Sequence, residues 1–380
     1  MPSSVEKSRL PWHRWSGSGG FARWIGVASP ALPRRRLSAG EVLWPMHLRP
    51  LPDELLSCWL VRLAYAHDLK LRTFARLLFP DQGEVWYLDM DRMAPVWLIE
   101  KLSAHTGLTA AKVLATTLRY YEGRLFRQYK ESGGLPWILP LKVSEWKRKG
   151  YGLQFCPACL AEDAVPYFRK RWRVAYYTWC PRHHVMLHDR CPNCGAAIAF
   201  HRRDLNAVSI DGVGSIAQCW QCDFDLRLAS AASPVLYEPS ASSAFEVALL
   251  RLDRRGRSIK PRGVRYYNVL HQLCHLMIGA RYRNVALGRF AAEAIGAPNL
   301  VLSGVRTFEA RAVDQRHHVA QLGFWFMADL EARLTAAWNA GVITQSALIR
   351  DFDDRPRKFD EIVARFADWR SRGLKGNDGL

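Results

Sequence analysis

The chain has 380 residues, of which 49% are hydrophobic, so two or three domains with buried cores are expected and global disorder is excluded. Its formal net charge of +19 favours a polyanionic partner, for which nucleic acid is the first expectation and a membrane surface the rival. No apolar run of about 18 residues exists, and the N-terminus lacks the continuous apolar core of a signal peptide. The sequence therefore predicts no membrane span, and we expect no membrane partner.

Residues 1–44 predict a basic, flexible tail. Ser, Gly and Pro are frequent there, apolar periodicity is absent, and three arginines stand in a row at 34–36. Such a tail can add phosphate contacts. A solvated tail without a role, or residues added by an upstream start codon, is the alternative.

The next stretch predicts a helix-turn-helix. A helix begins at Pro52 and carries an apolar stripe to about His67, and a second runs from Leu71 to Phe79, where Pro80 stops it. The basic residues on the outer side of the second helix are candidate DNA contacts. They are Lys70, Arg72 and Arg76. A solvated basic face is the alternative.

A similar helix pair follows. A helix over 99–106 is broken by Gly107, and Thr109 is expected to cap the next helix, whose apolar run reaches Leu118. Residues 132–150 read as a loop.

The most informative stretch holds four ligand pairs with two residues between the members of each. The first set is Cys156, Cys159, Cys180 and His183; the second is Cys191, Cys194, Cys219 and Cys222. Two such turns close a tetrahedral site with no open position, so the spacing predicts two structural zinc ions in tandem zinc ribbons. The remaining cysteines, Cys58 and Cys274, are expected in cores, and the thiol usage indicates a reducing compartment.

Several alternatives remain open for this array. Disulfides are disfavoured because a histidine completes one set, and a catalytic zinc is disfavoured because each site looks filled. His184 or His188 could replace His183 as a ligand. A cross-braced pairing of Cys156 and Cys159 with Cys191 and Cys194 is compatible with the same spacing.

Residues 167–173 alternate basic and aromatic side chains inside the first ribbon, as a nucleic-acid-binding strand or hairpin would. We expect Trp172 and Trp179 to pack the ribbon. Contacts to nucleic acid are expected from some of Arg169, Lys170 and Arg171. In the second ribbon Asp211-Gly212 predicts a hairpin turn.

Beyond an Ala-, Ser- and Pro-rich stretch at 229–244, the chain reads as helical again. A dense basic segment spans 251–265, helices are predicted near 266–279, 285–296 and 314–339, a further helix-turn-helix-like unit follows to 352, and the last helix covers 359–370.

Taken together, the patterns predict a mostly α fold with small β elements in the zinc ribbons. The expected parts are a tail (1–44), an N-terminal helical helix-turn-helix domain (45–150), tandem zinc ribbons (151–230), a linker (231–244) and a C-terminal helical domain with a helix-turn-helix-like unit (245–380).

Motifs of common enzymes are absent. The chain contains no G-x-x-x-x-G-K-[ST], H-E-x-x-H or G-x-S-x-G motif. Acidic residues are scattered, so spacing alone leaves a metal-dependent nuclease or recombinase open, although none of them stands in an apolar strand setting.

The order of these parts resembles the TniQ family of transposition proteins. The resemblance rests on the segments 51–64 (LPDELLSCWLVRLA), 155–160 (FCPACL), 179–184 (WCPRHH) and 191–195 (CPNCG), and it covers roughly residues 45–230. The later helices fit only in general character, and the tail has no counterpart.

Membership would imply a DNA-binding adaptor without catalysis that helps to select the target site for DNA transposition. Its partners would be DNA, an AAA+ ATPase regulator, the transposase and, in some relatives, an RNA-guided CRISPR complex. The zinc ligands would carry over onto the eight residues given above. A scaffold that docks on such a complex with little DNA affinity is the alternative, and a homodimer stays open. We expect a cytoplasmic, nucleoid-associated bacterial protein.

Overall fold

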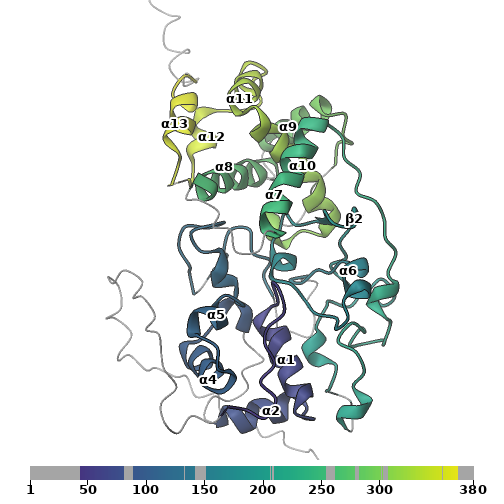
Figure 1. The fold of residues 1–380 in the computed structure, drawn as a ribbon. Coiled ribbons are helices and arrows are strands. Elements are labelled where there is room, and N and C mark those ends of the chain that lie inside the picture. Colours follow the sequence, from purple (N-terminus) through teal and green to yellow (C-terminus); the bar gives the residue numbers. More distant parts are fainter. Residues whose placement is uncertain are drawn as a thin grey trace, which may run out of the picture. The chain divides into compact units, whose positions relative to one another are not determined.

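The computed structural model describes residues 43–366 apart from 81–88, 132, 142–150, 206, 208, 254–261, 279–281, 301, 303–306 and 353. Helices dominate this part of the chain (Figure 1). Its strands are β1 (Trp179–Cys180) and β2 (Val185–Met186), paired antiparallel with Trp179 opposite Met186. The mostly α fold with small β elements is therefore confirmed.

Some sequence predictions fall outside the described residues. They are the tail up to residue 42, most of the basic segment near 251–265, and the end of the helix expected over 359–370. Within the described residues, no helix has both the length and the apolar character that crossing a membrane requires.

The N-terminal part is a set of short helices. They are α1 (Leu56–Ala66), α2 (Leu71–Leu78), α3 (Met90–Met93), α4 (Val96–Thr106) and α5 (Ala110–Leu114), followed by a 3-10 turn (Leu118–Tyr121). Gly107 ends α4 in the left-handed region with a φ of 69°, and the Thr109 side chain caps α5 by accepting from the Lys112 amide. Both signals act as the sequence predicts, but α5 is shorter than the apolar run.

Helix α1 is held at its N-terminus by three distant segments. The amide of Leu55 donates to the Phe168 carbonyl (3.0 Å), that of Leu56 to the Thr116 carbonyl (3.0 Å), and that of Ser57 to Asp91 Oδ1 (2.8 Å). The first amides of a helix have no partner within it. Because tertiary contacts satisfy them here, the position of α1 depends on segments far along the chain.

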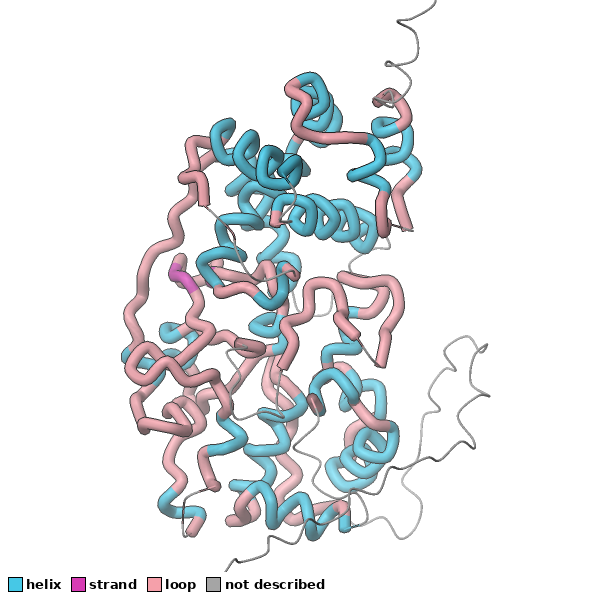
Figure 2. Tube along the Cα trace, turned by 180° about the vertical axis from the view of Figure 1, so that it is seen from behind, coloured by secondary structure: helices cyan, strands magenta, loops and turns pink. Residues whose placement is uncertain are grey.

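Residues 151–230 contain little regular structure (Figure 2). Their elements are α6 (Pro157–Glu162), β1, β2 and 3-10 turns at Lys170–Arg173, Phe200–Arg202, Ile210–Gly212 and Leu226–Leu228. The strand or hairpin expected over 167–173 is therefore wrong. Phe168, before the turn at Lys170–Arg173, and Trp172, within it, are both buried, with ring centroids 5.8 Å apart. The Asp211-Gly212 hairpin is wrong as well, since these residues lie in a 3-10 turn.

The described residues of the C-terminal part are mostly helical. Its helices are α7 (Pro239–Asp253), α8 (Arg262–Met277), α9 (Tyr282–Ala294), α10 (Val313–Ala328), α11 (Leu330–Asn339), α12 (Gln345–Ile349) and α13 (Arg357–Val363), with a 3-10 turn at Phe308–Ala310. Helix α10 packs against α7, α8 and α9.

Two boundaries in this part differ from the sequence prediction. The single helix expected over 314–339 is divided at Asp329, whose non-helical backbone (φ −146°, ψ 77°) ends α10 and whose side chain caps α11. The second half of the expected linker belongs to α7. That helix starts at Pro239 because Glu238 accepts the Ala241 amide (2.7 Å).

Buried polar contacts join α10 to the cysteine-rich region. The amide of Val313 donates to Asp189 (3.0 Å), Arg316 Nη2 donates to the Gln154 side-chain oxygen (3.0 Å), and Thr178 Oγ1 lies 3.0 Å from His317 Nδ1. The guanidinium of Arg316 is fully buried, and burial lowers its pKa to about 10. Its other contacts are to backbone carbonyls, including that of Ala175.

Candidate metal centres and basic surfaces

The first cluster joins the start of α6 to the turn between β1 and β2. Cys156 precedes α6, where Pro157 takes the first helical position, and Cys159 lies one turn on. Cys180 ends β1, and His183 follows in the turn. The ligand atoms of these four residues lie within 4.8 Å of one another, and the three thiols are buried.

The distances inside this cluster match four-coordinate metal binding. The Sγ atoms of Cys159 and Cys180 are 3.8 Å apart, and Nδ1 of His183 lies 3.4, 3.3 and 3.5 Å from the Sγ atoms of Cys156, Cys159 and Cys180. A tetrahedron with Zn–S bonds of about 2.3 Å and Zn–N bonds of about 2.0–2.1 Å has edges of roughly 3.8 and 3.6 Å. The donors therefore stand where a zinc-sized ion needs them.

The second cluster has the same geometry but more exposure. The Sγ atoms are 3.7 Å apart for Cys191 and Cys222 and 3.6 Å apart for Cys194 and Cys219. Gly195 has a φ of 72° and donates its amide to the Cys191 carbonyl, which closes the tight turn between Cys191 and Cys194. Cys194 is exposed and Cys222 half-buried.

The structure distinguishes the alternatives that spacing left open. Each cluster is sequential, so the cross-braced arrangement is not found. Sulfur separations above 3.5 Å are far from the roughly 2.05 Å of a disulfide. His188 instead bonds the Ser230 carbonyl through Nε2 (2.8 Å), and the His184 ring lies beside Trp179. Both clusters can hold a metal ion and fit tandem zinc ribbons.

A carboxylate stands behind the histidine of the first cluster. Glu162 Oε1, at the end of α6, lies 3.0 Å from His183 Nε2, the ring nitrogen that faces away from the thiols, and its other oxygen lies 2.7 Å from Arg182 Nη2. A carboxylate in this position fixes the tautomer and orientation of a metal-binding histidine. Sequence spacing gave no indication of it.

Three of the predicted DNA contacts are occupied within the protein. Arg169 and Lys170 are 3% and 6% exposed. Arg169 pairs with Asp163 (2.7 Å), while Lys170 and Arg171 pair with Asp53 (3.3 and 3.2 Å). The prediction of nucleic-acid contacts from Arg169 and Lys170 is therefore corrected, because a buried side chain that holds a carboxylate cannot reach a phosphate. Trp172 and Trp179 are buried, as expected.

The basic residues of α2 lie at a different kind of surface. Arg72 and Arg76 are exposed. The beginning of α2, however, contacts the second metal module, which is the second cluster with the loop between its ligand pairs. The Leu71 amide donates to Asp204, and Lys70 Nζ donates to the Ala207 carbonyl. The start of a recognition helix is the part that reaches base edges. Lys70 is thus engaged within the protein, and the prediction of DNA contacts on this helix is kept for the exposed Arg72 and Arg76.

Sequence reasoning missed a buried charge network beside α1. Arg173 is 1% exposed and contacts Asp89 (2.6 Å) and Asp91 (3.4 Å), and Asp91 also accepts from the Ser57 amide and hydroxyl. Burial raises the pKa of Asp91 from 3.8 to about 6, despite the opposing charge of Arg173. No local pattern could reveal it, because the partners are more than 80 residues apart in the sequence.

Comparison with known proteins identifies one region. The TniQ family model matches residues 45–187, which include α1 to α5 and all four ligands of the first cluster. The resemblance to this family of transposition proteins is therefore confirmed over 143 of the 380 residues. A search of curated proteins found no match.

Proposed function

We propose that this chain, with its TniQ domain, is a non-catalytic DNA-binding adaptor that helps to select the target site for DNA transposition. In this proposal it recruits an AAA+ ATPase regulator and, through it, the transposase. The observation that carries the proposal is the family match at 45–187, because it spans the N-terminal helices and the complete first cluster.

Zinc is the metal we assign to both clusters. Thiolate and imidazole donors in a closed set of four are typical of structural zinc, which would tie α6 to the β1–β2 turn and close the second module without supplying an open coordination position. Each ion would contribute about 10–16 kcal/mol of apparent binding free energy to folding.

DNA attraction is supported by the net charge of +19. In this proposal the N-terminal helices form the DNA-binding domain, and the exposed Arg72 and Arg76 of α2 contribute phosphate contacts. Residues 151–230 form the metal modules, and the helices from α7 onward provide surfaces for protein partners.

The test is duplex-DNA affinity of the zinc-loaded chain across a salt series. Because each neutralised phosphate steepens the dependence of log K on log salt by about 0.9, several contacts predict a steep fall in affinity. A flat profile would contradict DNA binding through charge. Incubation with magnesium and supercoiled plasmid should leave the plasmid intact. If the plasmid were cut, and if substitution of one carboxylate abolished that cutting, a nuclease would be favoured instead.

One observation favours a second candidate, a scaffold that docks on an RNA-guided CRISPR complex with little DNA affinity. Basic residues that looked available for DNA, such as Arg169 and Lys170, are buried and hold carboxylates instead. Pull-down of the ATPase regulator with and without DNA separates the two: the adaptor should require or be strengthened by DNA, whereas the scaffold should not.

A further inference from the structure

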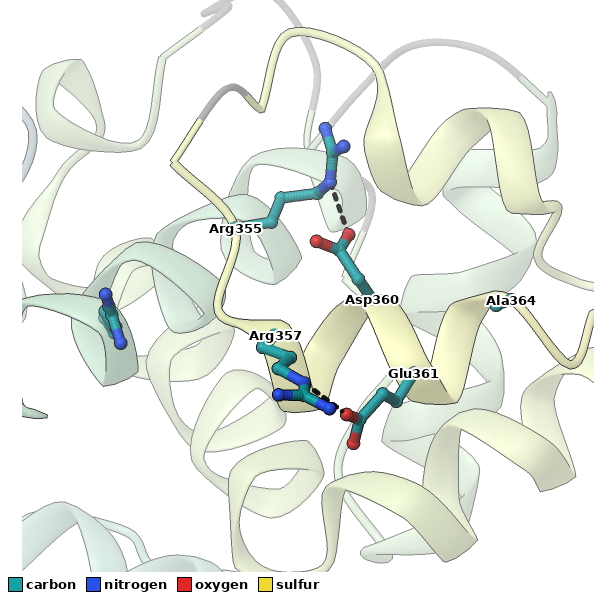
Figure 3. A pocket seen from close by; sticks show the side chains of 6 residues that line it. Arg355, Arg357, Asp360, Glu361 and Ala364 are labelled. Atoms are coloured by element: carbon teal, nitrogen blue, oxygen red, sulfur yellow. Dashed lines mark hydrogen bonds and ion pairs between the residues drawn. The ribbon is translucent and has the colours of Figure 1, made fainter.

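Two cavities are lined by cationic side chains, and their charge balance differs. The first, of about 500 Å³, lies at α13, where Arg355 pairs with Asp360 (2.6 Å) and Arg357 with Glu361 (2.9 Å) (Figure 3). Arg265 of α8 also lines it. Two of its three arginines are therefore neutralised by carboxylates of the adjacent helix.

The second cavity, of about 310 Å³, lies between the chain before α1 and the end of α5; we call it the α5 pocket. Its lining comes from three segments that are distant in the sequence and includes Arg49, Leu51, Asp53, Lys112, Ala115 and Lys170. Arg49 and Lys112 are exposed at this pocket, whereas the Lys170 side chain is 7% exposed.

The charges around the α5 pocket leave a positive excess. Its carboxylates already have partners: Asp53 holds Lys170 and Arg171, and Glu54 holds Arg62 (2.7 Å). Among the residues that the structure describes, neither Arg49 nor Lys112 has a carboxylate within ion-pair distance. Five cationic side chains thus surround two carboxylates, and an anion at the mouth would meet two cations that no internal acid neutralises.

The walls of the pocket indicate which anion. Leu51 and Ala115 present apolar surface beside Arg49 and Lys112. A phosphodiester has this combination of properties, since its phosphate carries charge and the attached sugar has an apolar face. Cations at the mouth and apolar walls below therefore suit one backbone unit of a nucleic acid, read without regard to sequence.

We propose that the α5 pocket is a phosphate-binding site for the nucleic-acid backbone, with Arg49 and Lys112 contacting the phosphate and Leu51 and Ala115 the adjoining sugar. The proposal deepens the DNA-binding function proposed above and rests on it. It places an anchoring contact at the α4–α5 unit, away from the basic residues of α2.

The test compares two doubly substituted, zinc-loaded chains with the same loss of charge. Arg49→Ala/Lys112→Ala should make the slope of log K against log salt shallower by about 1.8. It should also weaken binding of a labelled duplex about 30-fold at 0.15 M salt, as expected for two lost phosphate contacts. Arg265→Ala/Arg357→Ala, in the cavity of Figure 3, is the matched control and should change binding far less. All four side chains are exposed, so melting curves should stay close to wild type.

A third variant tests the cavity without changing charge. Ala115→Phe fills the pocket at a backbone position that tolerates a larger side chain (φ −64°, ψ −12°) and should also weaken binding. Equal loss in both double variants, or wild-type binding by Ala115→Phe, would overturn the pocket assignment while leaving DNA binding intact. Polyglutamate serves as a second probe, for protein carboxylates. If Arg49→Ala/Lys112→Ala kept its affinity for DNA but lost binding of polyglutamate, the pocket would instead be assigned to a protein carboxylate. No binding by the wild-type chain would overturn the proposed function itself.

Discussion

The two metal clusters share a geometry and differ in their surroundings. In the first, all three thiols are buried; in the second, Cys194 is exposed and Cys222 half-buried. The loop inside the first cluster, residues 160–179, supplies the Phe168 carbonyl that holds the start of α1 and the buried Arg169 and Arg173. The loop inside the second makes fewer hydrogen bonds to the N-terminal helices, such as that of Asp204 at α2, although its 3-10 turn at Phe200–Arg202 packs against α1.

This difference separates two uses of the same chemistry. Closing the first cluster fixes a loop on which the position of α1 depends, so the N-terminal helices and the first metal site should be lost together. Closing the second cluster fixes a module at the side of α2. Two closed sets of four ligands thus predict unequal consequences for the rest of the chain, and each of the following changes tests that inequality.

The largest effect should follow from Cys180→Ser. Loss of the first ion removes about 10–16 kcal/mol of metal-binding free energy, which matches or exceeds the roughly 5–15 kcal/mol stability of an ordinary domain. We expect a chain that loses cooperative unfolding, as followed by circular dichroism, with fewer than two zinc ions per chain by elemental analysis.

Cys222→Ser is the matched control in the second cluster. It should also lose one ion, but most of the helical signal and a cooperative transition should remain, because the thiol is half-buried and the N-terminal amides of α1 are held by other segments. Identical behaviour of the two variants would remove the distinction between the clusters.

The next effect concerns the buried Asp91 carboxyl, which lies between Arg173 of the first loop and Ser57 of α1. The pKa of Asp91 is about 6 in the folded chain and 3.8 ordinarily, so the folded chain favours the protonated carboxyl. Protonation of Asp91 therefore adds fully to the free energy of unfolding below about pH 4, and this addition is lost as the pH rises through 6. The shift corresponds to about 3 kcal/mol. Between pH 4 and 7 the wild-type chain should lose about this much unfolding free energy relative to Asp91→Asn, as measured by urea titration with zinc in excess. Parallel pH profiles would show that Asp91 does not titrate as described.

Glu162→Gln should weaken metal binding at the first cluster alone. The substitution removes the carboxylate behind His183 Nε2, and loss of such a partner typically costs 10–100-fold in metal affinity. Because Glu162 is about half exposed, we expect about tenfold, measured by competition with a chromophoric chelator. Arg182→Gln, which changes only the outer partner of Glu162, should have less effect. A change at the second cluster of the same protein would indicate general destabilisation.

Asp204→Ala should have the smallest effect. Asp204 accepts the Leu71 amide at the start of α2, and loss of a helix cap costs about 1 kcal/mol. We expect a small fall in the urea midpoint with both ions retained. A loss of cooperative unfolding like that expected of Cys180→Ser would mean that the second module supports the N-terminal helices as strongly as the first.

The metal clusters could be predicted from the sequence because their signal is local. Each ligand pair spans four residues, and a closed set of four needs no further information about the fold. Helices α1, α2 and α4 were predictable for a similar reason, since apolar spacing and the signals at Pro80 and Gly107 lie within one or two turns.

The roles of charged residues could not be predicted in this way. The basic run at 169–171 has the same sequence whether it faces water or holds Asp53, which lies more than 110 residues earlier in the sequence. The α5 pocket likewise draws on residues 49, 112 and 170. Propensity and spacing carry no information about contacts at such separations, so the ion pair of Lys170 with Asp53 could not be predicted from the sequence.

The contacts of α10 bear on how the protein can be divided for experiments. The family match ends at residue 187, yet Gln154 and Thr178 inside it meet Arg316 and His317 of α10 in the interior. A fragment that stops at the family boundary would open these polar groups to solvent and leave the adjoining apolar surface bare. Recombinant work on the TniQ region should therefore carry the helices through α10, because a shorter piece is prone to aggregate for reasons unrelated to its biological role.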